Sequence, residues 1–398
     1  MNCISDKSNC TGCGACVMHC KGNNLTMKQG MDGFMYPEKG DSRQCECGFV
    51  CPEISHVKKS DKPYPHLYAL QIKNEGVLLE STSGGAFYCI ADYVLQKGGY
   101  VCGVVYNDDL QAVHILTNNY DDLTYMHNSK YVKSDLKNVY REIKDKLESN
   151  FHVLFSGLPC EVGGLKSFLE KDYDKLITVD LVCTGVPSAR MFSDFINSIE
   201  LKKKIKIIDF KFRDKHKYGL SHTTVIRYIK AGKEKQKTIQ NRDCVSYYVA
   251  FGKQNCFRDK CYNCSYNSSA RVSDFTLGGF WSYSNTGGIL NENSGVSLVL
   301  SNSDNAENIV KSLNHIAHIE QYDGHGELNS NYGLCHHTPN PNYRYELFDS
   351  LNRNGYIKTA DKYFKAKGLI KRVASRMLPL PVKIFLTKYR RAIFNRFK

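Results

Sequence analysis

Four cysteines near the start of the chain have a spacing that suits an iron–sulfur cluster. Cys10, Cys13, Cys16 and Cys20 follow the pattern C-x2-C-x2-C-x3-C. Four thiolates on one short loop can wrap a cubane [4Fe-4S] cluster. The glycines and the alanine between the first three cysteines leave room for the inorganic core. The pattern therefore predicts an iron–sulfur site in this loop.

A second group of cysteines lies in "CECGFVCPE", which contains Cys45, Cys47 and Cys51. In ferredoxins with two clusters, the fourth cysteine of the first run binds the other cluster, and the second run ends in Cys-Pro. By this analogy, one complete cluster would have four ligands: Cys10, Cys13, Cys16 and Cys51. The other cluster would have three: Cys20, Cys45 and Cys47.

The missing ligand leaves alternatives open for the second cluster. It could be absent, contain three irons, or be completed by another residue such as Cys3. Zinc is the alternative metal for all of these thiols, because structural zinc sites use paired C-x2-C knuckles. A third and a fourth cysteine are superfluous for one knuckle, so the spacing favours iron–sulfur chemistry.

Two more cysteines follow strand-like segments in the middle of the chain. "HVLFSGLPC" at 152–160 ends at Cys160, and "LITVDLVC" at 176–183 ends at Cys183. The helical pattern between them predicts a βαβ unit, so both cysteines should lie at the carboxyl ends of parallel strands, where open α/β sheets place ligands. The C-x2-C pair at 261–264 could complete a four-sulfur site. The alternative is that both strand-end cysteines are small buried hydrophobic residues.

Three other segments could hold a phosphate or a flat cofactor. "STSGGAF" at 81–87 precedes a helical pattern and could bind an anion at the helix start, or simply cap the helix. "NSKYVKSD" at 128–135 offers polar groups and a ring, or forms a solvated loop. "RVSDFTLGGFW" at 271–281 is a strand pattern that breaks at two glycines beside the only tryptophan, which could admit a cofactor or make a turn.

The elements that must position these residues divide the sequence into four sections. Residues 1–60 predict an α+β ferredoxin-like iron–sulfur domain, and "DKPYPH" at 61–66 a linker. Strand and helix patterns alternate from 67 to 330 and predict an α/β body with a mixed, partly parallel sheet, in two regions, 67–150 and 151–330. Residues 331–398 form a linker and a basic amphipathic tail.

The amino-acid composition indicates in which compartment the protein works and which kinds of partner it binds. We expect no secretory signal and no membrane span, and the odd number of cysteines, 17, favours a reducing cytoplasm over disulfides. The net charge is +14, but twelve Lys and Arg and no acid lie within 362–398, so the body is not expected to bind nucleic acid. The tail could contact the inner face of the membrane peripherally, or be a solvated helix or a disordered end.

Six motifs in one order resemble a known family. They are Ser-Gly-Gly before a helix, Ser-Lys-Tyr, Gly-x-Pro-Cys, Asp-Leu-x-Cys, Cys-x2-Cys and Arg-Val-Ser-Asp with a Gly-Gly turn. Over about residues 1–330, they resemble the coenzyme F420 hydrogenase and dehydrogenase beta subunit family. The bacterial members with an N-terminal ferredoxin domain, often associated with surface-polysaccharide genes, are the most similar. The incomplete second cluster, Lys21 in place of a frequent proline, and the basic tail depart from the family pattern.

The resemblance implies two [4Fe-4S] clusters, a third incomplete one, and FAD. It carries over the ligands of a cluster beside the flavin, Cys160, Cys183, Cys261 and Cys264. It also carries over FAD contacts: Ser83, Gly84, Gly85, Lys130, Tyr131, Ser134, Asp274 and Gly278.

The function implied is that of a flavin-dependent iron–sulfur oxidoreductase. Electrons from a donor protein such as a ferredoxin would pass through the clusters to FAD and a small-molecule or sugar substrate, in surface-polysaccharide biosynthesis. A non-catalytic electron-transfer partner subunit is the alternative of another class, and a zinc-stabilised scaffold is a third. No catalytic residue is assigned; His216 and His222 lie in a polar stretch that could face the substrate or form a surface hairpin.

Overall fold

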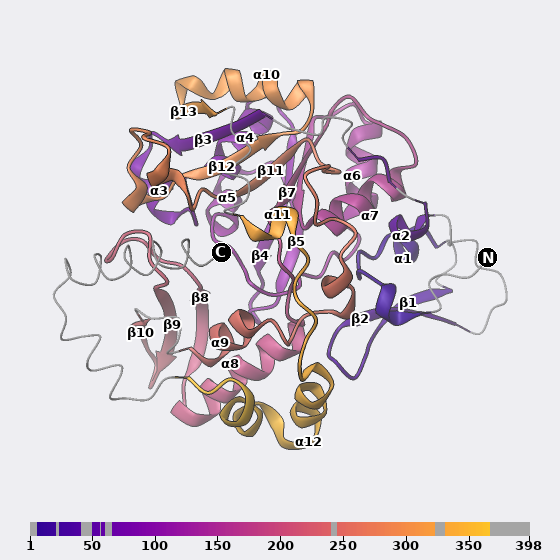
Figure 1. Ribbon diagram of the computed structural model, residues 1–398, viewed down its shortest axis with the longest axis vertical. Helices are drawn as coiled ribbons and strands as arrows, with labels where there is room; N and C mark the ends of the chain where they lie inside the picture. The colour runs from indigo at the N-terminus through magenta and orange to yellow at the C-terminus, as the bar shows by residue number, and fades with distance from the viewer. Residues whose placement is uncertain are drawn as a thin grey trace.

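An eight-stranded mixed sheet forms the centre of the protein (Figure 1). The computed structural model describes residues 6–20, 24–40, 50–55, 57–59, 66–239, 245–322 and 331–366. In their order across the sheet, the strands are β13 (Ala317–Tyr322), β3 (His66–Ile72), β12 (Ser297–Ser301), β11 (Phe275–Gly279), β7 (Leu176–Leu181), β6 (Val153–Gly157), β4 (Tyr100–Tyr106) and β5 (Ala112–Thr117). The predicted α/β body with a mixed, partly parallel sheet is confirmed.

The middle of this sheet is parallel. β4, β6, β7 and β11 run in one direction, and the strands outside them pair antiparallel. Helix α7 (Pro159–Leu169) connects β6 to β7, as the βαβ prediction requires. Because parallel strands end at the same edge, the segments that follow β6, β7 and β11 meet there.

Helices cover both faces of the large sheet. α4 (Ala86–Gln96), α5 (Tyr120–Met126) and α10 (Asp304–Ser312) pack on one face, and α6 (Val139–Glu148) and α7 on the other. Side chains of β3 alternate between two cores, because successive residues of a strand point to opposite faces: Tyr68, Leu70 and Ile72 join one core, and Leu67 and Ala69 the other. The predicted helix after the Ser-Gly-Gly segment is α4.

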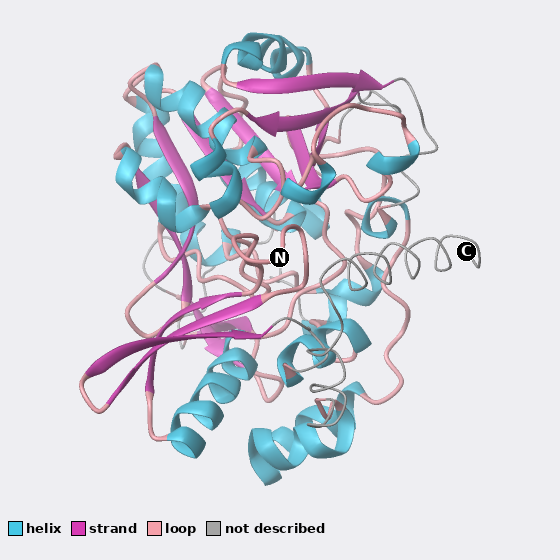
Figure 2. Cartoon of the chain, turned by 90° about the vertical axis from the view of Figure 1, so that its left-hand side faces the viewer, coloured by secondary structure: helices cyan, strands magenta, loops and turns pink. Residues whose placement is uncertain are grey.

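A smaller antiparallel sheet lies beside the large one (Figure 2). Its strands are β8 (Lys206–Lys211), β9 (Thr224–Lys230) and β10 (Lys233–Ile239). Three helices share its aromatic core: α8 (Ala189–Lys203), α9 (Ser246–Lys253) and α12 (Arg344–Tyr363), which bends at Gly355. Within this core, the Phe210 and Phe212 rings lie 4.8 Å apart. α12 falls in the section predicted as linker and tail, and its Leu347 and Leu351 pack into this core.

The N-terminal segment packs directly on the body. Its elements are η1 (Lys7–Asn9), α1 (Ala15–His19), β1 (Leu25–Gln29), β2 (Met35–Lys39) and α2 (Pro52–Ser55). α1 and α2 contact α7. Arg141 donates to the carbonyl oxygen of Met18 at 2.7 Å, and Arg344 bonds the Asp32 carboxylate at 2.7 Å. That this segment is a ferredoxin-type domain stays a prediction.

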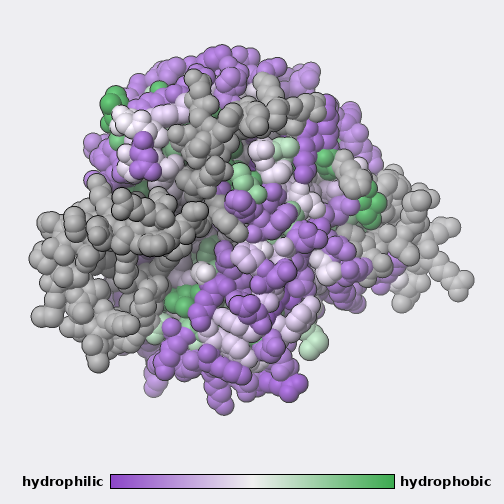
Figure 3. All heavy atoms as spheres, viewed as in Figure 1, coloured by the Kyte–Doolittle hydropathy of each residue, from purple (hydrophilic) through white to green (hydrophobic). Residues whose placement is uncertain are grey.

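Short helices complete the described part: α3 (Glu75–Glu80), η4 (Asp259–Asn263), η5 (Tyr283–Asn285), η6 (Glu292–Ser294), η7 (Leu313–His315) and α11 (Tyr332–Cys335). His66, the last residue of the predicted linker, already belongs to β3. In the described ranges, no helix has the length and apolar character needed to cross a membrane. The face in Figure 3 is mostly hydrophilic where its residues are described. The membrane contact was predicted for the tail at 362–398, of which 367–398 lie outside the described residues.

Candidate functional site

A cavity of about 700 Å³ lies at the carboxyl edge of the central parallel strands. Gly157 ends β6, Cys183 follows β7, and Gly278 lies at the end of β11, and all three line this cavity. The first turn of α4 forms another part of the wall. Cavities of several hundred cubic ångströms at such a sheet edge are typical cofactor and substrate sites.

Most of the residues predicted to contact FAD surround this cavity. Those that line it are Ser83, Gly85, Lys130, Tyr131, Ser134 and Gly278. Gly84 lies behind the wall, where its N–H donates to the Ser297 hydroxyl at 2.9 Å and a Cβ would meet a backbone oxygen. The Asp274 carboxylate accepts bonds from Thr178 and Ser303 and holds β11 in place. Gly84 and Asp274 therefore do not line the cavity.

Several buried polar atoms in the cavity wall have no protein partner among the described residues. They are both ring nitrogens of His127, Oδ1 of Asn128 and Nδ2 of Asn331. Buried polar groups in folded proteins nearly always form hydrogen bonds, so a wall with several orphaned atoms suits a polar ligand. These side chains therefore fit a bound cofactor of the size and polarity of a flavin.

The cavity wall also contains buried cations. Burial lowers the pKa of Lys130 to about 7, and its ammonium donates to the carbonyl oxygens of Tyr125 and Asn128. The Arg213 guanidinium donates to the Tyr131 hydroxyl at 3.0 Å and lies 4.9 Å from the Trp281 ring centre. These groups suit a ligand that carries negative charge.

Four cysteines from three distant segments come together beside the cavity. Cys160 lies in the first turn of α7, Cys183 follows β7, and Cys261 and Cys264 lie in and just after η4. Burial raises the pKa of each thiol, and the neighbouring cysteines raise those of Cys160, Cys183 and Cys264 further. The thiols of Cys160, Cys183, Cys261 and Cys264 are therefore close enough to influence one another, and that they bind one cluster stays a prediction.

Backbone N–H groups also face two of these sulfurs. Gly185 donates to Sγ of Cys183 at 3.4 Å, and Tyr266 donates to Sγ of Cys264 at 3.5 Å. Hydrogen bonds to cluster sulfurs are one of the means by which proteins stabilise iron–sulfur centres and set their potentials. The donor set therefore fits a [4Fe-4S] cluster.

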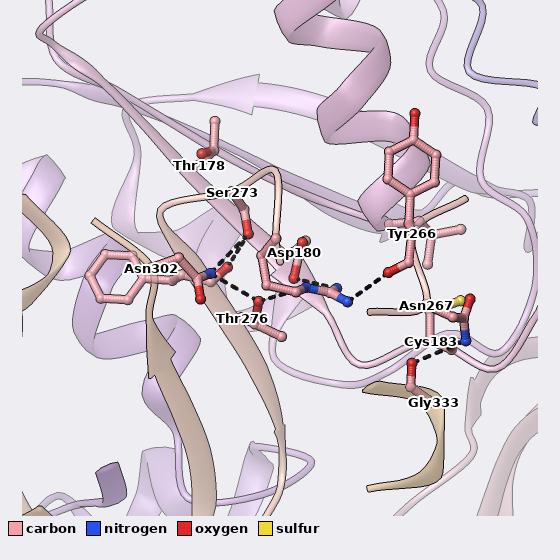
Figure 4. Close-up of polar contacts among 12 residues, drawn as sticks. Thr178, Asp180, Cys183, Tyr266, Asn267, Ser273, Thr276, Asn302 and Gly333 are labelled. Carbon is pink, nitrogen blue, oxygen red and sulfur yellow. Dashed lines mark hydrogen bonds and ion pairs between the residues drawn. The ribbon is translucent and has the colours of Figure 1, made fainter. Parts of the chain in front are cut away.

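A buried arginine, Arg271, fixes the segments that carry these cysteines; its partners Asp180, Tyr266 and Thr276 are labelled in Figure 4. Arg271 pairs with Asp180 of β7 at 2.9 Å, and it donates to Thr276 of β11 at 3.1 Å. It also donates to the carbonyl oxygen of Tyr266 at 2.9 Å, just after Cys264. Since these three partners belong to three segments, one side chain holds the strand ends and the cysteine loop in register.

The N-terminal cysteines form a second group. Burial raises the pKa of Cys13, and Cys10 raises it further; burial, Cys13 and Cys10 raise that of Cys51 to about 12. Cys10, Cys13 and Cys51 therefore lie near one another. Cys16 packs against a small apolar group that contains Cys20. Cys45 and Cys47, and with them the predicted second N-terminal cluster, lie outside the described residues.

The two cysteine groups are neighbours across α7. A Cβ on Gly164 of α7 would lie 2.7 Å from Cβ of Cys13, and Cys160 begins the same helix. Arg258 connects the loops as well: its guanidinium donates to the Cys10 carbonyl oxygen, and its own carbonyl accepts from Cys261 N–H. Within the described part of the chain, no three His, Cys, Asp or Glu are arranged to hold a single metal ion.

Several residues of this site lie outside the motifs. Arg213, His127 and Asn331 line the cavity without belonging to any motif. Arg213 lies in the polar stretch singled out for its histidines, and His222 of that stretch does line the cavity, whereas His216 pairs with Glu80 and Asp214. In the sequence, Arg213 is distinguished only by the alternation of cations at 211, 213 and 215, at the end of a strand.

Residues 151–323 match the family model that describes the C-terminal part of the coenzyme F420 hydrogenase/dehydrogenase beta chain. Over these residues, the chain is similar to that family. The matched region includes all four cysteines beside the cavity. The family resemblance inferred from the motifs is confirmed for residues 151–323, whereas the surface-polysaccharide type stays a prediction.

A solved structure is similar to the chain as well. A chain of the F420-reducing [NiFe] hydrogenase complex from Methanosarcina barkeri, studied by xenon derivatisation, is 12% identical, with a TM-score of 0.44, over 77% of this chain and 94% of that one. No curated protein matches the sequence.

Loss of the Arg271 charge should destabilise the fold. Arg271→Gln leaves the Asp180 carboxylate buried without a counter-ion, and we expect the free energy of unfolding to fall by about 3–5 kcal/mol in denaturant titrations followed by circular dichroism. Arg227→Gln, which breaks an exposed pair with Glu234, should cost at most about 1 kcal/mol. The double variant Asp180→Asn with Arg271→Gln should recover part of this loss of stability. If the double variant were as unstable as Arg271→Gln alone, the unpaired Asp180 charge would not be the cause.

Anion binding in the cavity should weaken as pH rises. The pKa of Lys130 is lowered to about 7, so its ammonium is mostly charged at pH 6 and mostly neutral at pH 8. We expect the affinity for FAD to fall by up to about tenfold over this range, measured by flavin fluorescence. Lys130→Met should reduce this slope, and Lys97→Met, an exposed lysine after α4, should not. An unchanged slope in Lys130→Met would contradict a role for this lysine.

Proposed function

We propose that the chain is an iron–sulfur flavoprotein oxidoreductase. The observation that carries this proposal is that Cys183 belongs both to a group of four cysteines and to the wall of a cavity with unpartnered polar atoms. The family match to a hydrogenase and dehydrogenase component supports redox chemistry. A [4Fe-4S] cluster exchanges single electrons and FAD exchanges one or two, so together they would join a one-electron donor to an organic substrate.

The chain's own residues would perform the binding and positioning. Cys160, Cys183, Cys261 and Cys264 would hold the cluster, and the wall formed by the start of α4, Lys130 and Tyr131 would bind the flavin. The Glu161 carboxylate lines the cavity, and although burial raises its pKa, the paired Lys133 ammonium holds that pKa below its ordinary value. This wall therefore keeps a fixed charged pair next to the cysteine site.

The N-terminal group would be the entry point for electrons. Cys10, Cys13, Cys16 and Cys51 would hold a further [4Fe-4S] cluster, in a segment that packs directly on α7. A ferredoxin-like protein is the proposed donor. A small molecule or sugar is the proposed substrate, in surface-polysaccharide biosynthesis, with the protein in the cytoplasm and its tail at the membrane.

Removal of one cavity-side ligand tests the proposal. Cys261→Ala should lower the iron content of the anaerobically purified chain by about four atoms and stop reduction of bound flavin by a one-electron donor, while FAD stays bound. Cys335→Ala, at an exposed cysteine outside both groups, is the matched control and should change neither quantity. Full iron content and unchanged flavin reduction in Cys261→Ala would contradict the proposal, and clusters without any flavin would favour a non-catalytic electron carrier.

A further inference from the structure

The Arg213 guanidinium is a buried charge in the cavity wall. Arg213 is 9% exposed, and it follows β8 on the same alternation as Lys211 and Lys215. Its hydrogen-bond partners among the described residues are the phenol groups of Tyr131 and Tyr248. Within that part of the chain, it forms no ion pair, so only neutral groups hold it.

Two described acids near this cavity already have other cationic partners. Glu161 pairs with Lys133, and Glu80 pairs with Lys211 at 2.7 Å. Lys215, whose pKa burial lowers to about 7, donates to the carbonyl oxygens of Ser83 and Ser294. Among the described residues, no carboxylate is therefore paired with Arg213. A buried charge without a counter-ion opposes folding, and proteins keep such groups where a ligand supplies the opposite charge.

The surroundings of Arg213 fix the plane of its guanidinium. Its Nε donates to the Tyr131 hydroxyl, and its central carbon lies 4.9 Å from the centre of the Trp281 ring. Tyr131 is itself held among the rings of Phe212, Tyr248 and Phe251. A planar guanidinium held in this way is preorganised to bind two oxygens of a phosphate or a carboxylate at once.

We propose that Arg213 anchors an anionic oxygen group, a phosphate or a carboxylate, of a molecule bound in the cavity. Two molecules could carry this group, the organic substrate or the flavin cofactor. The inference rests on the proposed function only in taking the cavity as the binding site, and it deepens that function by requiring a ligand with a negative charge next to Trp281.

The chain contains its own reporter for this contact. Trp281 is the only tryptophan, so the tryptophan emission of the full-length protein reports on the ring that stacks on Arg213. We would titrate the anaerobically purified protein with inorganic phosphate at constant ionic strength and record this emission together with the heat of binding. Phosphate should change the emission of the wild-type protein, and the affinity should fall at least tenfold in Arg213→Gln. Arg227→Gln, at the exposed arginine of β9, should bind phosphate as the wild type does.

Flavin titrations separate the two sources. If the substrate carries the anion, Arg213→Gln should bind riboflavin and FAD as the wild type does and lose only the phosphate response of the flavin-loaded protein. If the flavin carries it, the variant should lose affinity for FAD but not for riboflavin, which has no phosphate. Arg213→Lys, which keeps the charge but not the planar fork, should retain part of the affinity in either case.

The stability of Arg213→Gln to denaturant distinguishes a ligand-binding arginine from a purely structural one. Without a ligand, Arg213→Gln should unfold at the same or a higher denaturant concentration than the wild type, because it removes an uncompensated buried charge. An equal phosphate response in Arg213→Gln and the wild type, or a destabilised variant with unchanged binding of phosphate and FAD, would overturn the proposal. A chain that binds phosphate through Arg213 but contains no flavin would instead contradict the proposed function alone.

Discussion

The parallel pairing of β6, β7 and β11 is the constraint on which the rest of the site depends. Because these strands run in one direction, Gly157, Cys183 and Gly278 end up at one edge although they lie far apart in the sequence. The buried Arg271–Asp180 pair then fixes the cysteine loop against that edge. A four-thiol site and a ligand cavity thus share a wall, and neither could form from any one segment alone.

The distribution of charge gives this wall its chemical character. Lys133 neutralises the buried Glu161, whereas Lys130 and Arg213 form no ion pair with a described carboxylate. Orphaned polar atoms of His127 and Asn331 add hydrogen-bonding capacity on the same wall. A cavity of this kind favours an anionic, polar and partly planar molecule, which describes flavin nucleotides and anionic organic substrates alike.

Local sequence patterns predicted several helices and strands, but not all of the contacts between them. The βαβ unit that ends at Cys160 and Cys183, and the helix after Gly85, followed from periodicity and turn residues, and both are present. Arg213 could not be singled out, because its role depends on Tyr131 and Trp281, which only tertiary packing brings near it. For the same reason, the sequence motif predicted that Asp274 contacts FAD, whereas its carboxylate accepts a hydrogen bond from Thr178. α12 was missed because the apolar residues that bury it face a core made of distant segments.

The most direct test of the account is the cofactor content of the anaerobically purified, full-length chain. Iron, acid-labile sulfide and flavin would be determined per chain, together with the ultraviolet–visible spectrum. We expect about eight or more irons per chain, an equal amount of sulfide and one FAD. Zinc in place of iron and sulfide would contradict the interpretation of both cysteine groups, and iron with no flavin would contradict the assignment of the cavity.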